Sequence, residues 1–198
     1  VEKSLPQPQA GELLIKVKAA GVNYSDLLRR RTTYFMPTPL PYVLGAEAVG
    51  AIVARGEDVT EQPFVEGSPV LAILPSGGGY SEYVIAQAAY CVPLPPHVDA
   101  QAATALFVQG STAHLLLHDV VRDLEGKTLL IHAGASGVGS LLIQLAKMNG
   151  AKVIATASSD EKLGLAKHIG ADLTINYSSP YWTDQLIQAN KGEKVNIV

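Results

Sequence analysis

The stretch IHAGASGVGS, residues 131–140, has the glycine spacing of a turn that binds a phosphate group. An apolar run precedes the turn and a helix-like pattern follows it, which is the setting that such a turn requires. Ser136 stands at the second glycine of the usual pattern and is small enough to let backbone N–H groups approach a pyrophosphate. The turn therefore predicts a dinucleotide site. The expected cofactor-contacting residues are Gly134, Ala135, Ser136, Gly137, Val138 and Gly139.

The end of the next expected strand distinguishes between two dinucleotides. A site that prefers NAD places Asp or Glu there to accept hydrogen bonds from the ribose 2′-OH. This chain instead has Ala157 and Ser158, with Lys162 one helical turn further on. Hydroxyl and ammonium groups would receive a 2′-phosphate that a carboxylate would repel. Asp160 and Glu161 are ordinary residues for a first helical turn. The sequence therefore predicts NADPH as the cofactor.

The chain shows two sequence patterns, one in each half, and together they predict an α/β protein. Up to residue 98, short alternating stretches broken by Gly and Pro favour antiparallel strands. From residue 99 onward, buried strands alternate with helical patterns, which favours a doubly wound parallel sheet. We expect a β domain over 1–98 that contains one short helix capped by Ser25, and a Rossmann domain over 99–198. Asp99 would cap the first helix of the second domain, and Gly110 would interrupt that helix.

The stretch KVNIV, residues 194–198, predicts the beginning of a fourth parallel strand. A complete dinucleotide-binding sheet has about six strands. We therefore expect this chain to be a fragment of a longer protein in which the sheet continues.

The composition excludes several classes of partner. Of the 198 residues 47% are hydrophobic, the net charge is −3, and Lys and Arg are scattered, so a nucleic-acid surface is not predicted. No apolar run reaches the roughly 18 residues of a membrane span. The single cysteine, Cys91, favours a reducing compartment. We expect a cytoplasmic protein without nucleic-acid or membrane partners.

Longer motifs make the prediction more specific. The stretches AAGVNYSDLLRR, GGGYSEYVIA, AATALFVQGSTAHLLL and HAGASGVGSLLIQLAKMNGAKVIATASSDEKL resemble, in order and spacing, the zinc-free quinone oxidoreductase branch of the medium-chain dehydrogenase/reductase superfamily, which includes zeta-crystallin. The resemblance implies a GroES-like β domain joined to a Rossmann domain, an active site in the cleft between them, and a homodimer.

Two positions depart from the zinc-dependent members of that superfamily. Where those enzymes carry a cysteine and a histidine as metal ligands, this chain has Tyr24 and Ala46. A catalytic zinc needs about three protein ligands, so no metal site is expected. Hydride transfer from NADPH to a quinone, or to the alkene carbon of an electron-poor enone, needs no metal and is the predicted reaction.

The resemblance also implies roles for individual residues. Asn23 and Tyr34 match residues near the nicotinamide and the acceptor and are the candidate catalytic residues. Thr112 matches a residue at the nicotinamide end of the cofactor. Lys162 and Tyr177 match residues that cradle the 2′-phosphate. A second aromatic residue, which the branch sometimes carries facing the substrate, is replaced here by Leu28. The resemblance therefore does not define how the substrate is contacted on that side.

Two other functions remain open from the sequence. One is an enoyl reductase that acts on thioester-bound enoyl chains, and the other is a structural protein that holds NADPH without turnover. Three further groups are interpreted as structural: the carboxylates Asp26 and Glu47, the pair His114 and His118, and the basic run 29–31 as a solvated helix end. The respective alternatives are a general acid and base, a metal-binding pair and an anion site.

Overall fold

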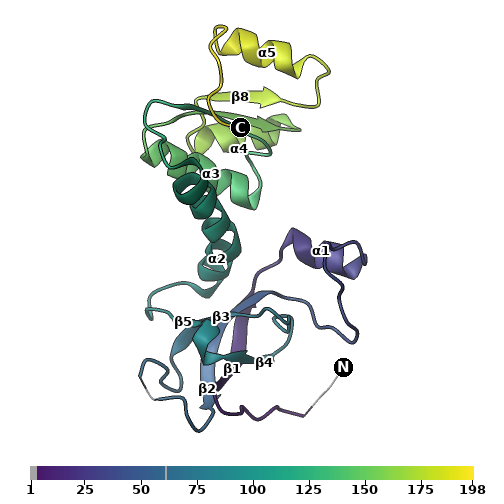
Figure 1. Cartoon of the computed structure of the whole chain (residues 1–198), viewed down its shortest axis with the longest axis vertical. Helices are drawn as coiled ribbons and strands as arrows, with labels where there is room; N and C mark the ends of the chain where they lie inside the picture. The colour runs from purple at the N-terminus through teal and green to yellow at the C-terminus, as the bar shows by residue number, and fades with distance from the viewer. Residues whose placement is uncertain (1–3, 61) are drawn as a thin grey trace. The chain divides into compact units, whose positions relative to one another are not determined.

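Two compact units make up the chain, of which the computed structural model describes residues 4–60 and 62–198 (Figure 1). The division falls after Val108, inside helix α2 (Ala100–His114), whereas the sequence places the boundary before this helix, between residues 98 and 99. The first unit is a β structure with one short helix, and the second alternates parallel strands with helices. The predicted fold class is therefore confirmed.

The N-terminal unit is built on a five-stranded sheet in the order β4-β1-β2-β3-β5. Every neighbouring pair is antiparallel, as the alternating sequence pattern predicts. The strands are β1 (Glu12–Ala20), β2 (Glu47–Arg55), β3 (Pro69–Ile73), β4 (Tyr83–Gln87) and β5 (Cys91–Pro93), with the 3-10 helix η1 (Ala88–Tyr90) before β5.

Both faces of this sheet are covered by apolar side chains. Leu13 and Ile15 of β1 pack with Ile52 of β2 on one face. On the other face, Val49 and Leu71 pack against the beginning of α2. The alternation along each strand thus divides between two clusters, which fixes the register of the sheet.

Helix α1 (Tyr24–Arg30) begins two residues earlier than the predicted cap Ser25 would place it. Its N-cap is Asn23 and not Ser25, so that prediction was wrong. The reason is the spacing of Asn23 and Asp26, because the Asn23 backbone N–H donates to the Asp26 carboxylate at 3.0 Å. This reciprocal pairing of cap and third helical residue uses an N–H group that would otherwise lack a partner.

Helix α2 begins as predicted and ends differently. The Asp99 carboxylate accepts hydrogen bonds from the N–H groups of Gln101 and Ala102, which confirms its role as the cap. Gly110, expected to interrupt the helix, lies inside it. The chain continues directly into the π-helical segment η2 (Leu115–Val121). None of the helices formed by the described residues is long and apolar enough to span a membrane.

The C-terminal unit contains a parallel sheet in the order β6-β7-β8. Ile197 forms a parallel bridge with Leu129 on the other edge of β6. The predicted fourth strand therefore lies beside the first, as the strand order 3-2-1-4 of a dinucleotide-binding fold requires. The strands are β6 (Thr128–Ile131), β7 (Lys152–Ala157) and β8 (Leu173–Asn176).

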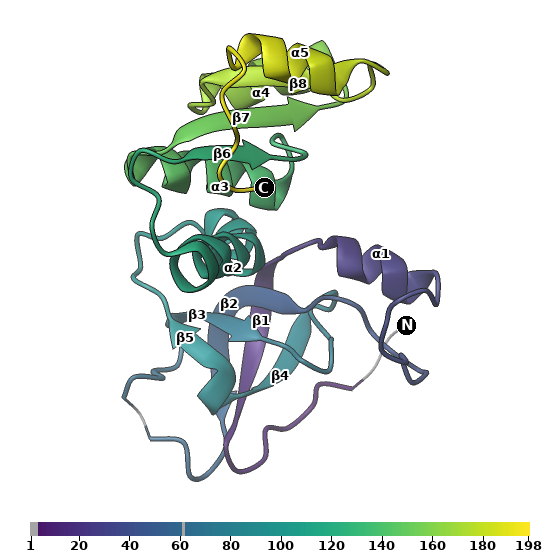
Figure 2. The same ribbon diagram turned by 45° about the horizontal axis from the view of Figure 1, so that its top comes forward.

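Helices cover both faces of this parallel sheet (Figure 2). Ile143 of α3 and Ala166 of α4 pack with η2 on one face. Leu186 and Trp182 of α5 pack on the opposite face. Burial on both faces explains the apolar runs of β6 and β7, whereas β8, with the sequence LTIN, alternates and is less buried. The helices are α3 (Gly137–Met148), α4 (Asp160–His168) and α5 (Trp182–Ala189).

An ion pair connects the elements of this unit at the end away from the glycine turn. The Lys147 ammonium of α3 donates to both Asp172 carboxylate oxygens, at 3.0 and 2.9 Å, and the Val153 N–H of β7 donates to the same group at 2.6 Å. Partial burial alone would raise the pKa of Asp172. The Val153 N–H and the positive charges of Lys147 and Lys167 outweigh it, so the pKa is lowered.

Replacing Asp172 with Asn should therefore destabilise the fold in a pH-dependent way. We expect Asp172→Asn to lower the free energy of unfolding by about 1 kcal/mol at neutral pH, the upper end for a partly exposed pair. Because the folded pKa is lowered, this contribution is present above the unfolded pKa of about 4 and is lost as the pH falls through the folded pKa. Urea unfolding across this pH range measures the difference.

Glu193→Gln is the matched control, since Glu193 pairs with Lys152 at 3.3 Å through a more exposed side chain. Its effect should be smaller. Equal losses in the two variants, or a difference for Asp172→Asn that does not shrink in acid, would contradict the role given to this carboxylate.

Candidate functional site: a phosphate-binding pocket at the carboxyl ends of the parallel strands

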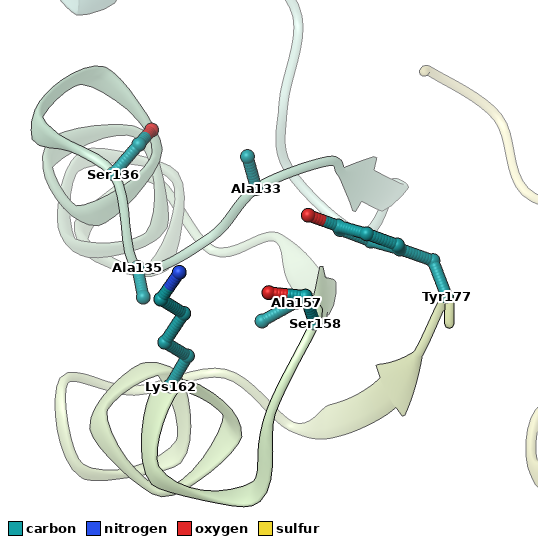
Figure 3. A pocket seen from close by; sticks show the side chains of 7 residues that line it. All are labelled: Ala133, Ala135, Ser136, Ala157, Ser158, Lys162 and Tyr177. Carbon is teal, nitrogen blue, oxygen red and sulfur yellow. The ribbon is translucent and has the colours of Figure 1, made fainter. Parts of the chain in front are cut away.

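A small pocket of about 110 Å³ lies where β6, β7 and β8 end (Figure 3). In a parallel sheet these ends share one edge, and in open α/β folds ligands bind just beyond it. Three segments supply the lining: the turn after β6, the end of β7 with the start of α4, and the residue after β8. The lining residues are Ala133, Ala135, Ser136, Ala157, Ser158, Lys162 and Tyr177.

The turn after β6 ends in the N-terminus of α3. Ser136 is the N-cap of this helix, and its Oγ accepts a hydrogen bond from the Gly139 N–H at 3.1 Å. The serine that departs from the usual glycine pattern therefore has a local role, because Ser is among the best N-cap residues. The helix begins at Gly137 and directs its positive end at the pocket edge.

Two of the glycines make close contacts that leave no room for a side chain. A Cβ at Gly139 would lie 2.3 Å from the Ala133 carbonyl oxygen, and a Cβ at Gly134 would lie 2.8 Å from the Ala155 Cβ. Any side chain at these positions would push α3 away from β6 and β7. The glycine spacing is thus required by close packing of strand and helix, in addition to its fit for a phosphate.

Polar groups face the pocket from two sides. In Figure 3 the Lys162 ammonium and the Tyr177 hydroxyl point toward the space between the turn and the end of β7. No described carboxylate lies within 4.0 Å of the Lys162 nitrogen. The pocket therefore combines an ammonium group without an ion-pair partner in the described chain with hydroxyl groups from Ser158 and Tyr177. This donor set suits a phosphate.

Hydrogen bonds hold the two sides of the pocket together. The Tyr177 N–H donates to the Ala157 carbonyl at 3.1 Å. The Ser178 hydroxyl donates to the Ser158 carbonyl at 3.3 Å, and the Ser178 N–H donates to Asn176 Oδ1 at 2.9 Å. Ser178 and Asn176 were not singled out in the sequence. An Asn two residues before a Ser is a recognisable turn signal that could have identified them.

The remaining predicted cofactor residues do not line this pocket. Gly137 packs on Gln109 of α2, where an added Cβ would lie 2.8 Å from the Gln109 Cγ. Val138 and Gly139 are in the first turn of α3. Thr112 lies in α2, three residues beyond Gln109, and its contact with the nicotinamide end of a cofactor stays a prediction.

The N-terminal unit contains a buried polar network around the two predicted structural carboxylates. The Asn23 amide donates to both Glu47 carboxylate oxygens, at 3.0 and 3.1 Å. The Asp26 carboxylate accepts from the Tyr80 hydroxyl at 3.0 Å and from the Gly45 N–H at 3.2 Å. Asp26 and Glu47 therefore pair with neighbours, as interpreted from the sequence. Tyr80 and Gly45 were missed, although both lie in glycine-containing motifs.

Electrostatics within this network follow from burial. Glu47 is fully buried, which raises its pKa; the Asn23 hydrogen bonds oppose this shift and the nearby Asp26 charge adds to it. Burial and the Asp26 carboxylate together raise the pKa of Tyr80 to about 12. Asn23 itself is only 7% exposed. Its amide is committed to Glu47, so the side chain holds the network in place at the beginning of α1.

Tyr34 lies after α1 in an aromatic group. The Arg29 guanidinium carbon is 4.0 Å from the centroid of the Tyr34 ring and 5.3 Å from that of Tyr42. The Phe35 ring centroid is 4.5 Å from that of Tyr34. Arg29 is thus partly buried, whereas Arg30 and Arg31 are exposed. The interpretation of the basic run as a solvated helix end is correct for those two residues and wrong for Arg29.

Cys91 and the pair His114 and His118 belong to neither the pocket nor the buried network. Cys91 is a buried free thiol, and burial raises its pKa to about 11, so it is poorly reactive. The His114 and His118 rings pack with their centroids 4.5 Å apart. The described residues contain no group of three His, Cys, Asp or Glu side chains placed to hold a metal ion.

Comparison with known families agrees with this architecture. Residues 9–96 match the alcohol dehydrogenase GroES-like domain, and residues 137–198 match the family described as zinc-binding dehydrogenase. The chain is 36% identical over 91% of its length to quinone-oxidoreductase QR1 of Triphysaria versicolor and 32% identical over its whole length to a 2-haloacrylate reductase of Burkholderia sp.. It spans 56% and 60% of those two proteins.

Solved structures give the same picture. The chain superposes on Escherichia coli quinone oxidoreductase complexed with NADPH with a TM-score of 0.90 and 31% identity, covering all of this chain and 60% of that one. It superposes on CurK enoyl reductase with a TM-score of 0.83 and 28% identity, covering 97% of this chain and 59% of that one.

A GroES-like β unit followed by a Rossmann-type unit with a glycine turn defines the class of protein, which is that of the two matching dehydrogenase families. The chain belongs to the medium-chain dehydrogenase/reductase superfamily, in its quinone oxidoreductase, zeta-crystallin-like branch. It spans a little more than half the length of the relatives it matches.

Two glycine substitutions test the packing of the turn. Gly139→Ala should strongly destabilise the C-terminal unit, because the added Cβ would overlap the Ala133 carbonyl. Gly164→Ala is the matched control in α4, where an added Cβ meets nothing within 4 Å. That change should raise the free energy of unfolding by up to about 1 kcal/mol through helix propensity. Urea unfolding of the two variants measures both. Similar effects of the same sign would contradict the close packing at Gly139.

A metal analysis tests the expectation that no catalytic zinc is held. The ligand positions of the zinc-dependent relatives are occupied here by Tyr24, which is 69% exposed, and Ala46. We expect purified protein to contain far less than one zinc per chain after dialysis, by atomic emission. About one equivalent that resists a chelator would contradict this expectation.

Proposed function

We propose that this chain binds NADPH and, in the protein that carries it, transfers hydride to a quinone or an electron-poor alkene. The observation that carries the proposal is the pocket at the ends of β6 to β8, where Ser158, Lys162 and Tyr177 converge. No acid stands at the end of β7, where an NAD site would need one. The solved relative with NADPH and the relatives named quinone oxidoreductase support the same assignment.

Each group of residues would hold a different part of the cofactor or of the acceptor. The α3 N-terminus and the turn at Gly134 to Gly139 would hold the pyrophosphate, and Lys162 with Ser158 and Tyr177 would hold the 2′-phosphate. When bound, the nicotinamide supplies the hydride. On the N-terminal unit, Tyr34 would place its hydroxyl at the acceptor oxygen. Asn23 would act indirectly, by holding α1 through its bonds to Glu47.

The surface around Tyr34 supports an apolar acceptor. In the segment that follows Tyr34, four large apolar side chains are exposed, and exposed apolar side chains suit an apolar ligand. These residues are Phe35, Met36, Leu40 and Val43. A quinone or enone ring would bury part of this surface, while its carbonyl oxygen accepted a hydrogen bond from the tyrosine.

Two alternatives are distinguished by assay. The structural likeness to an enoyl reductase favours a thioester-bound enoyl substrate as the second candidate. A protein that holds NADPH without turnover is the third. NADPH oxidation with a simple quinone, with an enone and with an enoyl thioester separates the three. The homodimer and the cytoplasmic location also stay predictions, the latter supported by a free, buried Cys91.

Cofactor preference gives the most specific test of the pocket. NADPH should bind at least about tenfold more tightly than NADH, a difference of about 1.4 kcal/mol. Lys162→Ala should narrow this difference, chiefly by weakening NADPH, because the ammonium faces the phosphate that NADH lacks. Lys194→Ala, an exposed lysine outside the pocket, is the charge-matched control. Fluorescence titration measures each affinity. Equal affinities of the unmodified chain for NADPH and NADH would contradict the assignment of NADPH as the cofactor.

A further inference from the structure

Arg29 differs from its basic neighbours in where its side chain lies. It occupies the last turn of α1, and its guanidinium carbon lies over the Tyr34 ring, 4.0 Å from the centroid. The Tyr42 ring is 5.3 Å away, and the Arg29 Nη1 donates to Thr38 Oγ1 at 3.2 Å. One side chain therefore contacts three points of the segment that follows α1.

The positive charge of Arg29 is not neutralised locally. Within the part of the chain that the structure describes, no carboxylate lies within 4.0 Å of its guanidinium group. A cation over an aromatic face is attracted by the ring quadrupole, and the attraction grows as water is excluded. The guanidinium plane also stacks on aromatic rings, which an ammonium group cannot do. Arg29 thus stacks on the Tyr34 ring, and the positive charge of its guanidinium group stays uncompensated at that ring.

We propose that Arg29 is a positioning residue for the acceptor site: by stacking on Tyr34 it fixes the ring and places a permanent positive charge beside the acceptor oxygen. This inference rests on the proposed function, in which the Tyr34 hydroxyl contacts that oxygen. Arg29 acts through Tyr34 and makes no contact with the reacting atoms.

The negative charge that develops on the acceptor during the reaction explains how a nearby cation would help. When hydride adds to the acceptor, its electron pair forms the new bond and the displaced π electrons move onto the acceptor oxygen. NADPH is oxidised to NADP⁺, and the oxygen gains a negative charge before it takes a proton from Tyr34 or water. A fixed cation near this position stabilises the developing anion more than the neutral acceptor, so it favours the transition state over the ground state.

Three variants test the proposal by activity. Arg29→Gln removes the charge and keeps a planar end group, Arg29→Lys keeps the charge without the stacking plane, and Arg30→Gln removes an exposed neighbouring charge. In the full protein that carries this chain, Arg29→Gln should lower kcat for quinone reduction by about tenfold or more, with KM and the NADPH affinity changed by less than about twofold. Arg29→Lys should recover part of the loss, and Arg30→Gln should stay near the unmodified protein.

A labelling measurement tests the contact without turnover. N-acetylimidazole modifies accessible tyrosines, and Tyr90, which is 50% exposed and lies in η1, provides the internal reference. Arg29→Gln should increase acetylation of Tyr34 relative to Tyr90, and Arg30→Gln should not. Peptide mass spectrometry measures the ratio.

The outcomes separate this inference from the proposed function. If the unmodified protein reduces quinones and Arg29→Gln matches Arg30→Gln in both assays, the inference is overturned and the proposed function stands. If the unmodified protein reduces no acceptor, the proposed function fails, and the labelling ratio alone decides whether Arg29 holds Tyr34.

Discussion

The close approach of α3 to the end of β6 is the constraint on which the C-terminal unit depends. Gly139 lies against the Ala133 carbonyl and Gly134 against the Ala155 side chain, with no room for a Cβ at either position. This contact brings the positive end of a helix to the carboxyl edge of a parallel sheet. It also requires a small residue in β7 opposite Gly134, and Ala155 stands there. A phosphate site is a consequence of this packing before any side chain contributes.

The parallel register then brings distant residues together. The β7–β8 pairing sets Ala157 opposite Asn176, so the residues that follow each strand, Ser158 and Tyr177, are neighbours. Nineteen positions of sequence separate them, but the fold makes them the two walls of one pocket. The Ser178 hydroxyl, bonded to the Ser158 carbonyl, holds these walls at a fixed separation. Preorganisation of this kind reduces the entropic cost of binding a charged group.

Much of this arrangement could be predicted from the sequence, because the signals are local. Glycine spacing, apolar runs and the missing acid at Ala157 identify the turn, the parallel sheet and the pocket-lining Lys162. The details that were not predicted depend on tertiary contacts. Ser25 is a good cap residue, but the Asn23–Asp26 pairing determines where α1 begins. Arg29 lies in a basic run that would be solvated on an isolated helix. The return of the chain from Tyr34 past Thr38 to Tyr42 partly buries it.

The central claim is that the pocket at the ends of β6 to β8 recognises a 2′-phosphate. Titrating the ¹⁵N-labelled chain with adenosine 2′,5′-bisphosphate, and separately with adenosine 5′-monophosphate, tests this claim without any acceptor. The account predicts binding of the bisphosphate at least about tenfold tighter, with the largest amide shifts at Ser158, Lys162 and Tyr177. Equal affinity for the two nucleotides, or shifts that fall outside this pocket, would contradict it.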